Sequence, residues 1–238
     1  MHNIFTAFWI RKSHKWLALI TGLQLLIWLG SGAYMVLMDI EFIRGKTLTN
    51  TPTSKPLQAN LYEYSFNDLL KDYPDATEIN LYTLGGNAVY SARMAGKLQR
   101  LDATTGHLLP ILSEQQAIEI ASQLYRGDTK VNNTVLYQQH PPREISARFL
   151  PVWAVEFASP MTPTLYISAV TGQLVSTRHN YWRAFDFLWM LHIMDYEERE
   201  DVNNNLLGLV SSLSLLTAMF GIALTYISFR RRLDKQDD

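Results

Sequence analysis

Histidines are the residues of this 238-residue chain with the widest chemical use, and two of the six lie where a cofactor could reach them. The chain has no cysteine, which excludes disulfides, thiolate metal sites and thiol catalysis. It also has no H-E-x-x-H, G-x-S-x-G or phosphate-loop motif, so neither hydrolase nor nucleotide chemistry is indicated. Four histidines fall in a terminus, turns or loops, where we expect solvated side chains: His2, His107, His140 and His179. His14 and His192 remain as candidate metal or cofactor ligands.

His14 lies just before a long apolar run, on the same predicted helix. The positions four and eight residues later are Ala18 and Gly22, so one helix face reads histidine, small, small. An imidazole can ligate iron, and small residues beside it leave space for a flat macrocycle. We therefore predict His14 as a haem ligand and Gly22 as part of the cofactor surface.

His192 lies in a second candidate site, within an aromatic segment from Tyr181 to Tyr196. The segment predicts an amphipathic helix at the membrane surface. Three aromatic residues precede His192 by ten, seven and three positions and share its helix face: Trp182, Phe185 and Trp189. An aromatic wall beside a histidine suits a haem edge or a quinone ring, with His192 as the ligand and Trp189 as its nearest aromatic neighbour.

A simpler interpretation of the same residues is structural. Histidine and tryptophan are common anchors at membrane interfaces, and small residues in membrane helices usually serve helix packing. Ala18 and Gly22 could then face a matching small stripe on the second apolar helix: Ser214, Ala218, Gly221 and Thr225. Both interpretations stay open at this stage.

Two uncharged apolar runs must position these histidines. Trp16 to Met38 has 23 residues and Leu206 to Phe229 has 24, each long enough for a hydrocarbon core about 30 Å thick. The sequence thus predicts two transmembrane helices in contact with the lipid bilayer. The net charge of -1 gives no argument for a nucleic-acid partner.

Basic residues beside the two runs predict their orientation. They precede the first run at Arg11, Lys12 and Lys15, and follow the second at Arg230, Arg231, Arg232 and Lys235. Basic flanks stay in the cytoplasm, so both termini are expected there, with residues 39–205 exported. A cleaved signal peptide, with small residues at 31–33, is the alternative for the first run.

The exported middle predicts two α+β units, each a helix packed on an antiparallel sheet. Asp102 to Leu108 (DATTGHL) matches Ser168 to Leu174 (SAVTGQL) at an offset of 66 residues. Ser113 and Gln116 predict a capping box for the second unit's helix, and residues 44–60 read as an extended polar linker. The predicted parts are a cytoplasmic N-terminus at 1–15, a transmembrane helix at 16–38, a linker at 39–59, α+β units at 60–112 and 113–178, an interfacial helix with connector at 179–205, a transmembrane helix at 206–229 and a cytoplasmic tail at 230–238.

These motifs resemble a known family. The D-A-x-T-G-x-L strand end, preceded by the S-x-x-Q-A-I-x-I-A helix of Ser113 to Ala121, is similar to a PepSY domain. The R-K-x-H-K-W-L-A-L-I-T-G-L run of Arg11 to Leu23 and the L-H-I-M-D-Y run of Leu191 to Tyr196 resemble PepSY-associated transmembrane proteins. The resemblance implies two PepSY-like units, a bacterial inner-membrane location and a link to iron–siderophore uptake and haem-dependent reduction; larger relatives have additional spans.

We therefore expect a membrane electron-transfer or ferric-siderophore-reduction accessory component that binds haem b. His14 and His192 are expected about 30 Å apart, so bis-histidine haem requires a homodimer or larger complex. A redox partner protein is then expected as well. The alternatives are a membrane-anchored interaction module that inhibits or chaperones a peptidase, and a small subunit of a larger membrane complex.

Overall fold

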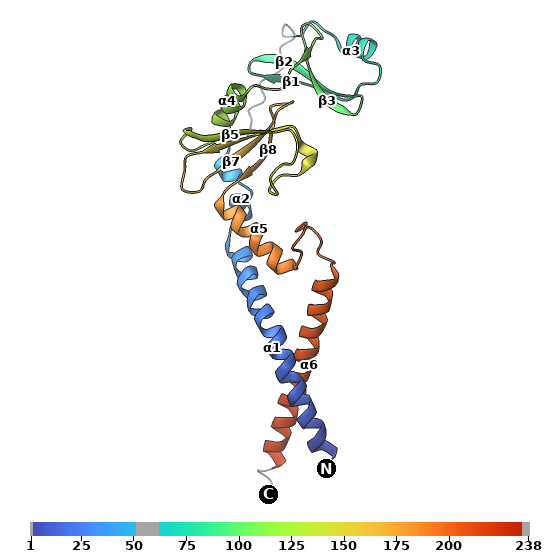
Figure 1. Cartoon of the computed structure of the whole chain (residues 1–238), viewed down its shortest axis with the longest axis vertical. Helices are drawn as coiled ribbons and strands as arrows, with labels where there is room; N and C mark the ends of the chain where they lie inside the picture. The colour runs from blue at the N-terminus through green and yellow to red at the C-terminus, as the bar shows by residue number, and fades with distance from the viewer. Residues whose placement is uncertain (1, 51–61, 235–238) are drawn as a thin grey trace. The chain divides into compact units, whose positions relative to one another are not determined.

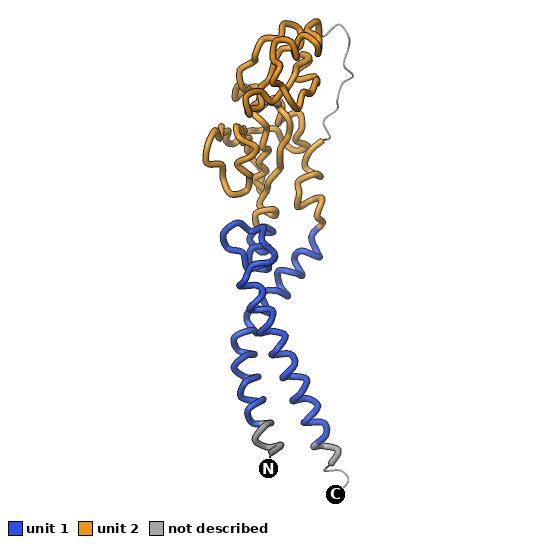
Figure 2. Tube along the Cα trace, turned by 90° about the vertical axis from the view of Figure 1, so that its right-hand side faces the viewer, with its two compact units in different colours: residues 1–38, 184–238 blue, residues 39–183 orange. Residues whose placement is uncertain are grey.

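The structure, a computed structural model, describes residues 2–50 and 62–234, without the side chains of 2–7 and 231–234. It forms two compact units, which Figure 2 colours separately. One unit comprises residues 1–38 and 184–238, and the other comprises residues 39–183. The class is α+β, with two long apolar helices and two four-stranded antiparallel sheets.

The first unit is built on two long helices, α1 (His2–Leu37) and α6 (Asn205–Asp234), which pack on each other (Figure 1). The segments Phe8–Leu37 and Asn205–Arg230 are long and apolar enough to cross a membrane. Their large hydrophobic side chains face outward, as at Leu29 and Ile222, which are 70% and 71% exposed. Outward apolar side chains on uncharged helices of this length support membrane association.

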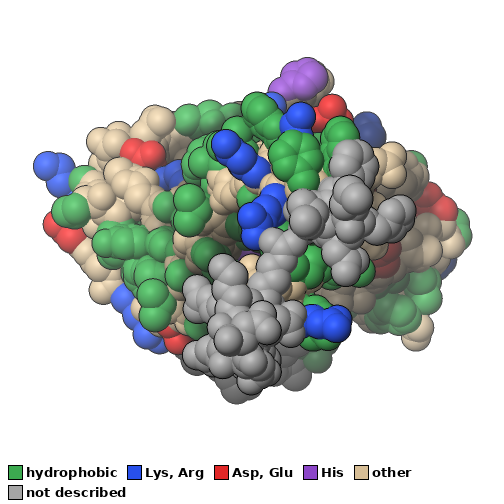
Figure 3. All heavy atoms as spheres, turned by 90° about the horizontal axis from the view of Figure 1, so that it is seen from below, with side chains coloured by type: hydrophobic (Ala, Val, Ile, Leu, Met, Phe, Trp, Pro, Cys, Tyr) green, Lys and Arg blue, Asp and Glu red, His purple; other side chains and the backbone are tan. Residues whose placement is uncertain are grey.

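Basic residues lie on the same helices beyond the apolar stretches. α1 is already helical at Arg11, Lys12 and Lys15, and these side chains are exposed, as is Arg230 on α6. The space-filling view from this end shows Lys and Arg side chains among hydrophobic ones (Figure 3). The helices thus extend past the predicted spans, since nothing in the sequence breaks them there. Lys235 lies outside the described residues.

Helix α5 (Asn180–Ile193) leads to α6 through a loop organised by Asp195. Its carboxylate accepts four backbone N–H groups of the loop, at 2.9–3.2 Å. These hydrogen bonds hold the pKa of Asp195 below its usual value. Asn204 then caps α6 by accepting the N–H of Leu207 at 2.8 Å. The connection between α5 and α6 is therefore defined by hydrogen bonds from its own residues.

The second unit contains two sheets of the same plan. In the first, β1 (Thr77–Leu84), β2 (Asn87–Met94), β3 (Lys97–Asp102) and β4 (Leu108–Leu109) pair in chain order, and α3 (Phe66–Asp72) covers one face through buried Leu69. In the second, β5 (Val131–Tyr137), β6 (Val152–Phe157), β7 (Thr164–Ser168) and β8 (Leu174–Arg178) also pair in order, and α4 (Glu114–Leu124) covers one face. Both helices start with a capping box, and the one predicted at Ser113 and Gln116 is confirmed.

The polar linker differs from the extended chain predicted for residues 44–60. Within residues 44–50 the chain forms the 3-10 turn η1 (Lys46–Leu48), which follows the short helix α2 (Ile40–Ile43). Asp39 caps α2 by accepting the N–H of Phe42 at 2.8 Å, and Gly45 then reverses the chain with φ of 74°. Residues 51–61 lie outside the described residues. A second short 3-10 turn, η3 (Ala147–Phe149), precedes β6.

His179 departs from the expectation of a solvated side chain. It is fully buried, and its Nε2 donates to the carbonyl of Phe42 at 2.9 Å. Its ring lies 5.0 Å from the Phe42 ring. The expectation was wrong because the α2 segment packs on the end of β8, a contact between residues far apart in the chain. His107 and His140 are exposed, as expected. His2 lies among the residues whose side chains are not described.

Candidate functional site

His14 faces α6 from the first half of α1. Its Nδ1 lies 3.0 Å from the backbone carbonyl of Thr217, a residue of helix α6. Because a carbonyl oxygen only accepts hydrogen bonds, Nδ1 must carry the hydrogen. In the neutral ring this leaves Nε2 with its lone pair, which is the tautomer that binds a metal through Nε2.

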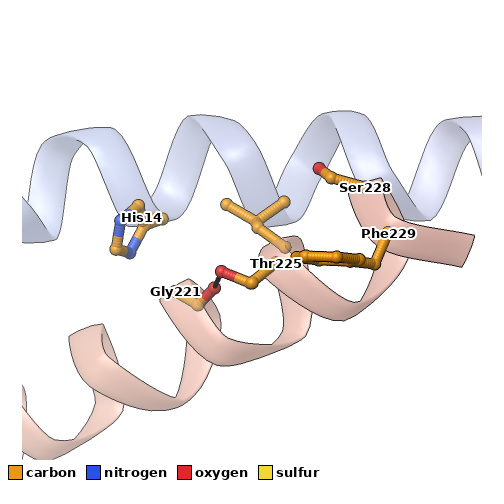
Figure 4. A pocket seen from close by; sticks show the side chains of 6 residues that line it. His14, Gly221, Thr225, Ser228 and Phe229 are labelled. Carbon is orange, nitrogen blue, oxygen red and sulfur yellow. Dashed lines mark hydrogen bonds between the residues drawn. The ribbon is translucent and has the colours of Figure 1, made fainter. Parts of the chain in front are cut away.

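A groove of about 450 Å³ lies beside His14, between α1 and α6 (Figure 4). Apart from His14 its lining comes from α6: Gly221, Leu224, Thr225, Ser228 and Phe229. A Cβ added to Gly221 would lie 3.2 Å from Cε1 of His14, so the imidazole sits almost on the α6 backbone. The groove is open, apolar along most of its wall, and bordered by one imidazole.

The predicted small-residue face of α1 is rotated away from this contact. An added Cβ at Gly22 would meet no atom within 4 Å in the described part of the chain. Thr21 is buried instead, and its hydroxyl lies 3.4 Å from that of Thr217. On α6 Ala218 of the expected stripe is exposed and Thr217 is buried, but Gly221 of the same stripe lies against His14 as expected. On α1 the contact is displaced by one position, from Gly22 to Thr21, which is a rotation of about 100° around the helix.

His192 is held by the second half of α1. Its Nδ1 lies 2.8 Å from the hydroxyl of Ser31, and that hydroxyl is 2.7 Å from the carbonyl of Ile27. The serine hydrogen is used by the carbonyl, so the hydroxyl oxygen accepts from Nδ1–H of His192. Gly32 lies beside the same ring, with an added Cβ at 3.6 Å from Cε1. The second histidine thus has the same tautomer and the same kind of glycine neighbour as the first.

The aromatic wall expected beside His192 separates into different contacts. The Trp189 indole donates to the carbonyl of Arg199 in the following loop, at 3.0 Å. Phe185 lies 6.5 Å from Tyr34 on α1, between ring centroids. Trp28, on α1, donates to the carbonyl of His192 at 2.8 Å. Sequence reasoning missed Trp28 and Ser31, although a polar side chain in an uncharged span is itself a signal that a partner is needed.

Trp182, the third aromatic residue of the expected wall, belongs to the second unit. The guanidinium of Arg178 lies 4.0 Å from the centroid of its ring, in a cation–π contact. The guanidinium of Arg178 therefore lies against the ring face of Trp182 within the second unit.

The two histidines do not meet within one chain. Ser31, which holds His192, lies seventeen residues after His14 on α1. At about 1.5 Å per residue this places the two imidazoles about 25 Å apart along the helix. A single macrocycle cannot bridge that distance, so each histidine would supply its own site.

The two imidazoles are compatible with haem ligation. No cluster of three or more His, Asp or Glu side chains arranged for a metal is found among the described residues. Haem needs only one or two axial imidazoles, because the porphyrin supplies the other iron ligands. Each histidine presents one nitrogen suited to this role, with the ring orientation fixed by the other nitrogen.

Comparisons with known proteins add no further assignment. No protein-family model, curated protein sequence or solved structure matches the chain.

Proposed function

We propose that this protein is a membrane-embedded electron-transfer component that binds haem b at His14 and at His192. The observation that carries the proposal is the shared hydrogen bonding of the two imidazoles. Each donates from Nδ1 to an oxygen of a neighbouring helix, which leaves Nε2 as the ligating atom. This arrangement fixes the tautomer and orientation of both rings before any cofactor binds.

The protein's own residues position the proposed ligands. The Thr217 carbonyl and the Ser31 hydroxyl orient the rings, and Gly221 and Gly32 allow them to lie against helix backbone. The groove beside His14 is lined by Leu224 and Phe229, whose apolar side chains disfavour water. Bound haem would supply one-electron chemistry, since its iron alternates between the ferric and ferrous states.

A second chain completes each site in the proposal. One chain supplies one imidazole per site, and bis-histidine ligation requires two. In a two-fold dimer, His14 would face His14 of the partner, and His192 would face its own counterpart. Two sites about 25 Å apart along α1 would then form a path for electrons through the bilayer. A larger complex could supply the partner histidines in the same way.

The proposal also includes a bacterial inner-membrane location and a role in the reduction of ferric iron. The basic residues Arg11, Lys12 and Lys15, with Arg230 on α6, support cytoplasmic termini and an exported second unit. The repeat of a helix on a four-stranded sheet supports the PepSY resemblance, and with it a bacterial inner membrane. Electrons from a redox partner protein would cross the membrane and reduce ferric iron carried by a siderophore to ferrous iron.

The haem content of the purified protein tests the proposal. The full chain is purified in detergent from haem-replete cells, and haem is measured per chain. A dimer with two sites predicts about one haem per chain, and His14→Ala or His192→Ala would each reduce this to about half. A protein without haem would contradict the proposal and favour the alternative of a membrane-anchored interaction module.

A further inference from the structure

Aromatic residues gather in the second unit where α2 meets the end of β8 and the start of α5. The Phe42 ring lies 5.0 Å from the His179 ring and 5.4 Å from the Tyr181 ring, between centroids. His179 is fully buried, whereas Tyr181 is 46% exposed. The cluster therefore has a buried base in His179 and an open aromatic side in Tyr181.

Helix α2 is fixed to the body of the second unit by its C-terminal end. Ile43 is buried, with an exposed fraction of 1%. Gly45 lies so close to Thr177 on β8 that a Cβ added to it would be 2.6 Å from the Cβ of Thr177. Ile40 in the first turn of α2 is nevertheless 44% exposed, so a firmly held helix presents an apolar side chain at the surface.

A cation borders the aromatic cluster. Trp182 follows Tyr181 directly in α5, and the Arg178 guanidinium that lies against its ring also donates from Nε to the carbonyl of Glu144 at 3.0 Å. Tyrosine and tryptophan combine an apolar ring with a polar group and are enriched where a membrane meets water. The positive charge beside these rings suits the phosphates of lipid headgroups.

The covalent chain limits how far this surface can lie from a membrane. The first stretch that is long and apolar enough to cross a membrane ends at Leu37, and Ile40 and Phe42 follow it by three and five residues. An extended chain spans about 3.5 Å per residue, so Ile40 lies within about 11 Å of Leu37 and Phe42 within about 18 Å. A bilayer around this stretch is therefore within reach of both side chains.

We infer that this surface of the second unit inserts into the headgroup region of the lipid bilayer and holds the unit against the membrane. The surface consists of Ile40, Phe42, Tyr181, Trp182 and Arg178. A bilayer fits it because the surface continues directly from a membrane-spanning stretch and has the residue types of a membrane interface. The inference goes beyond haem binding and does not depend on it. It also gives the start of the predicted linker, residues 39–59, a membrane contact of its own.

Spin labels at single cysteines test this inference in the full chain, which has no cysteine of its own. Ile40→Cys and Tyr181→Cys are labelled and reconstituted in nanodiscs of phosphatidylethanolamine and phosphatidylglycerol. Oxygen concentrates in lipid and a water-soluble nickel chelate is excluded from it, so collisions of the label with each of the two agents distinguish lipid from water. For both labels we expect a ratio of oxygen to nickel collisions that is several-fold higher than for a label in water.

Phe66→Cys is the matched control, because Phe66 is 50% exposed on α3 of the same unit but lies far from Leu37 in sequence. Its label should collide freely with nickel. Labels at positions 40 and 181 that collide with nickel as often as this one would overturn the inference. Labels shielded from both agents would show a contact with protein instead of lipid and would also overturn it. The two sites lie on different helices, so either variant decides the outcome if the other does not fold.

Discussion

Nδ1 of His192 lies 2.8 Å from the Ser31 hydroxyl, whose own hydrogen is directed to the Ile27 carbonyl 2.7 Å away. The serine therefore accepts from the imidazole and fixes its tautomer. A serine in an apolar helix commonly satisfies its hydroxyl on the preceding turn, and here its second function is to hold a ring on another helix. This relationship connects α5 to α1 and leaves Nε2 of His192 with the lone pair that the proposed haem ligation requires.

Ser31→Ala removes the acceptor and leaves Nδ1–H of His192 without its partner. Loss of a hydrogen bond that orients a metal ligand typically weakens binding by 10- to 100-fold, so we expect about tenfold weaker haem binding. Haem titration of the purified apo-protein measures this. Ser212→Ala is the matched control, because the exposed Ser212 donates only to Gly208 on its own helix. Equal effects of the two substitutions would contradict the role assigned to Ser31.

Two glycines test the contact between α1 and α6 that the structure shows. Gly221→Ala places a methyl group 3.2 Å from His14, which must move away from α6. We expect it to reduce haem content and to lower the stability of the helix pair by about 1–3 kcal/mol. Gly22→Ala meets no atom within 4 Å and should be neutral. Haem per chain and thermal unfolding in detergent measure both effects, and a larger effect of Gly22→Ala than of Gly221→Ala would contradict the contact that the structure shows.

The Glu144–Arg183 ion pair predicts a large effect of charge removal in the second unit. The Glu144 side chain is 14% exposed and that of Arg183 is 33% exposed. Glu144→Gln leaves the guanidinium without a charged partner, and we expect a loss of about 2–3 kcal/mol, below the 3–5 kcal/mol of a fully buried pair. Glu78→Gln is the control, since its pair with Arg93 is exposed and should contribute much less to the free energy of unfolding. Chemical unfolding measures both variants. If Glu144→Gln and Glu78→Gln lowered the free energy of unfolding by similar amounts, the buried pair would contribute no more than the exposed one, which would contradict the prediction.

The same pair predicts a dependence on pH. Burial alone raises the pKa of Glu144, but hydrogen bonds from Arg183 and Tyr166 and the nearby charges lower it overall. A carboxyl with a lowered pKa stabilises the fold above its unfolded-state pKa of about 4.5. That contribution is lost as pH falls through the lower folded-state value. The stability of the wild type should therefore fall toward that of Glu144→Gln as the pH decreases below about 4.5. Unfolding of both proteins at several pH values would show this.

His179 predicts acid sensitivity at higher pH. Burial lowers the pKa of His179, although its hydrogen bonds to backbone at Phe42 and Ile43 act in the opposite direction. The unfolded chain then binds a proton near pH 6.5 before the folded chain does, so stability falls as pH decreases from there. This one group can change the free energy of unfolding by at most about 1.4 kcal/mol per pH unit. His179→Gln, which retains a donor for Phe42, should flatten the profile between pH 6.5 and 5, and an unchanged profile would contradict this.

Local signals predicted the elements of the fold well. Ser113 and Gln116 form the capping box that their spacing indicated, and the repeated Thr-Gly turns follow equivalent strands. The short strands β4 and β8 have no clear signal in the sequence, since the two residues of β4 give no alternation and β8 mixes apolar and polar residues.

The candidate sites could be predicted only in part. His14 and His192 were identified from their types and positions, but the orientation of their helices was not. Helices α1 and α6 are apolar on all sides, so the sequence has no amphipathic stripe to show which face meets the partner helix. Thr217 and Ser31 lie more than 160 positions in sequence from the histidines that they contact, so only the structure shows that they are partners. Helix rotation depends on such contacts, and no local pattern encodes it.

The reduced-minus-oxidised absorption spectrum of the purified full chain tests the central claim most directly. It would be recorded for the wild type, His14→Ala, His192→Ala and the double variant, each prepared in detergent from haem-replete cells. We predict a b-type spectrum in the wild type, about half the amplitude in each single variant, and none in the double variant. A colourless wild type, or a double variant with the full wild-type spectrum, would contradict haem binding at these two histidines.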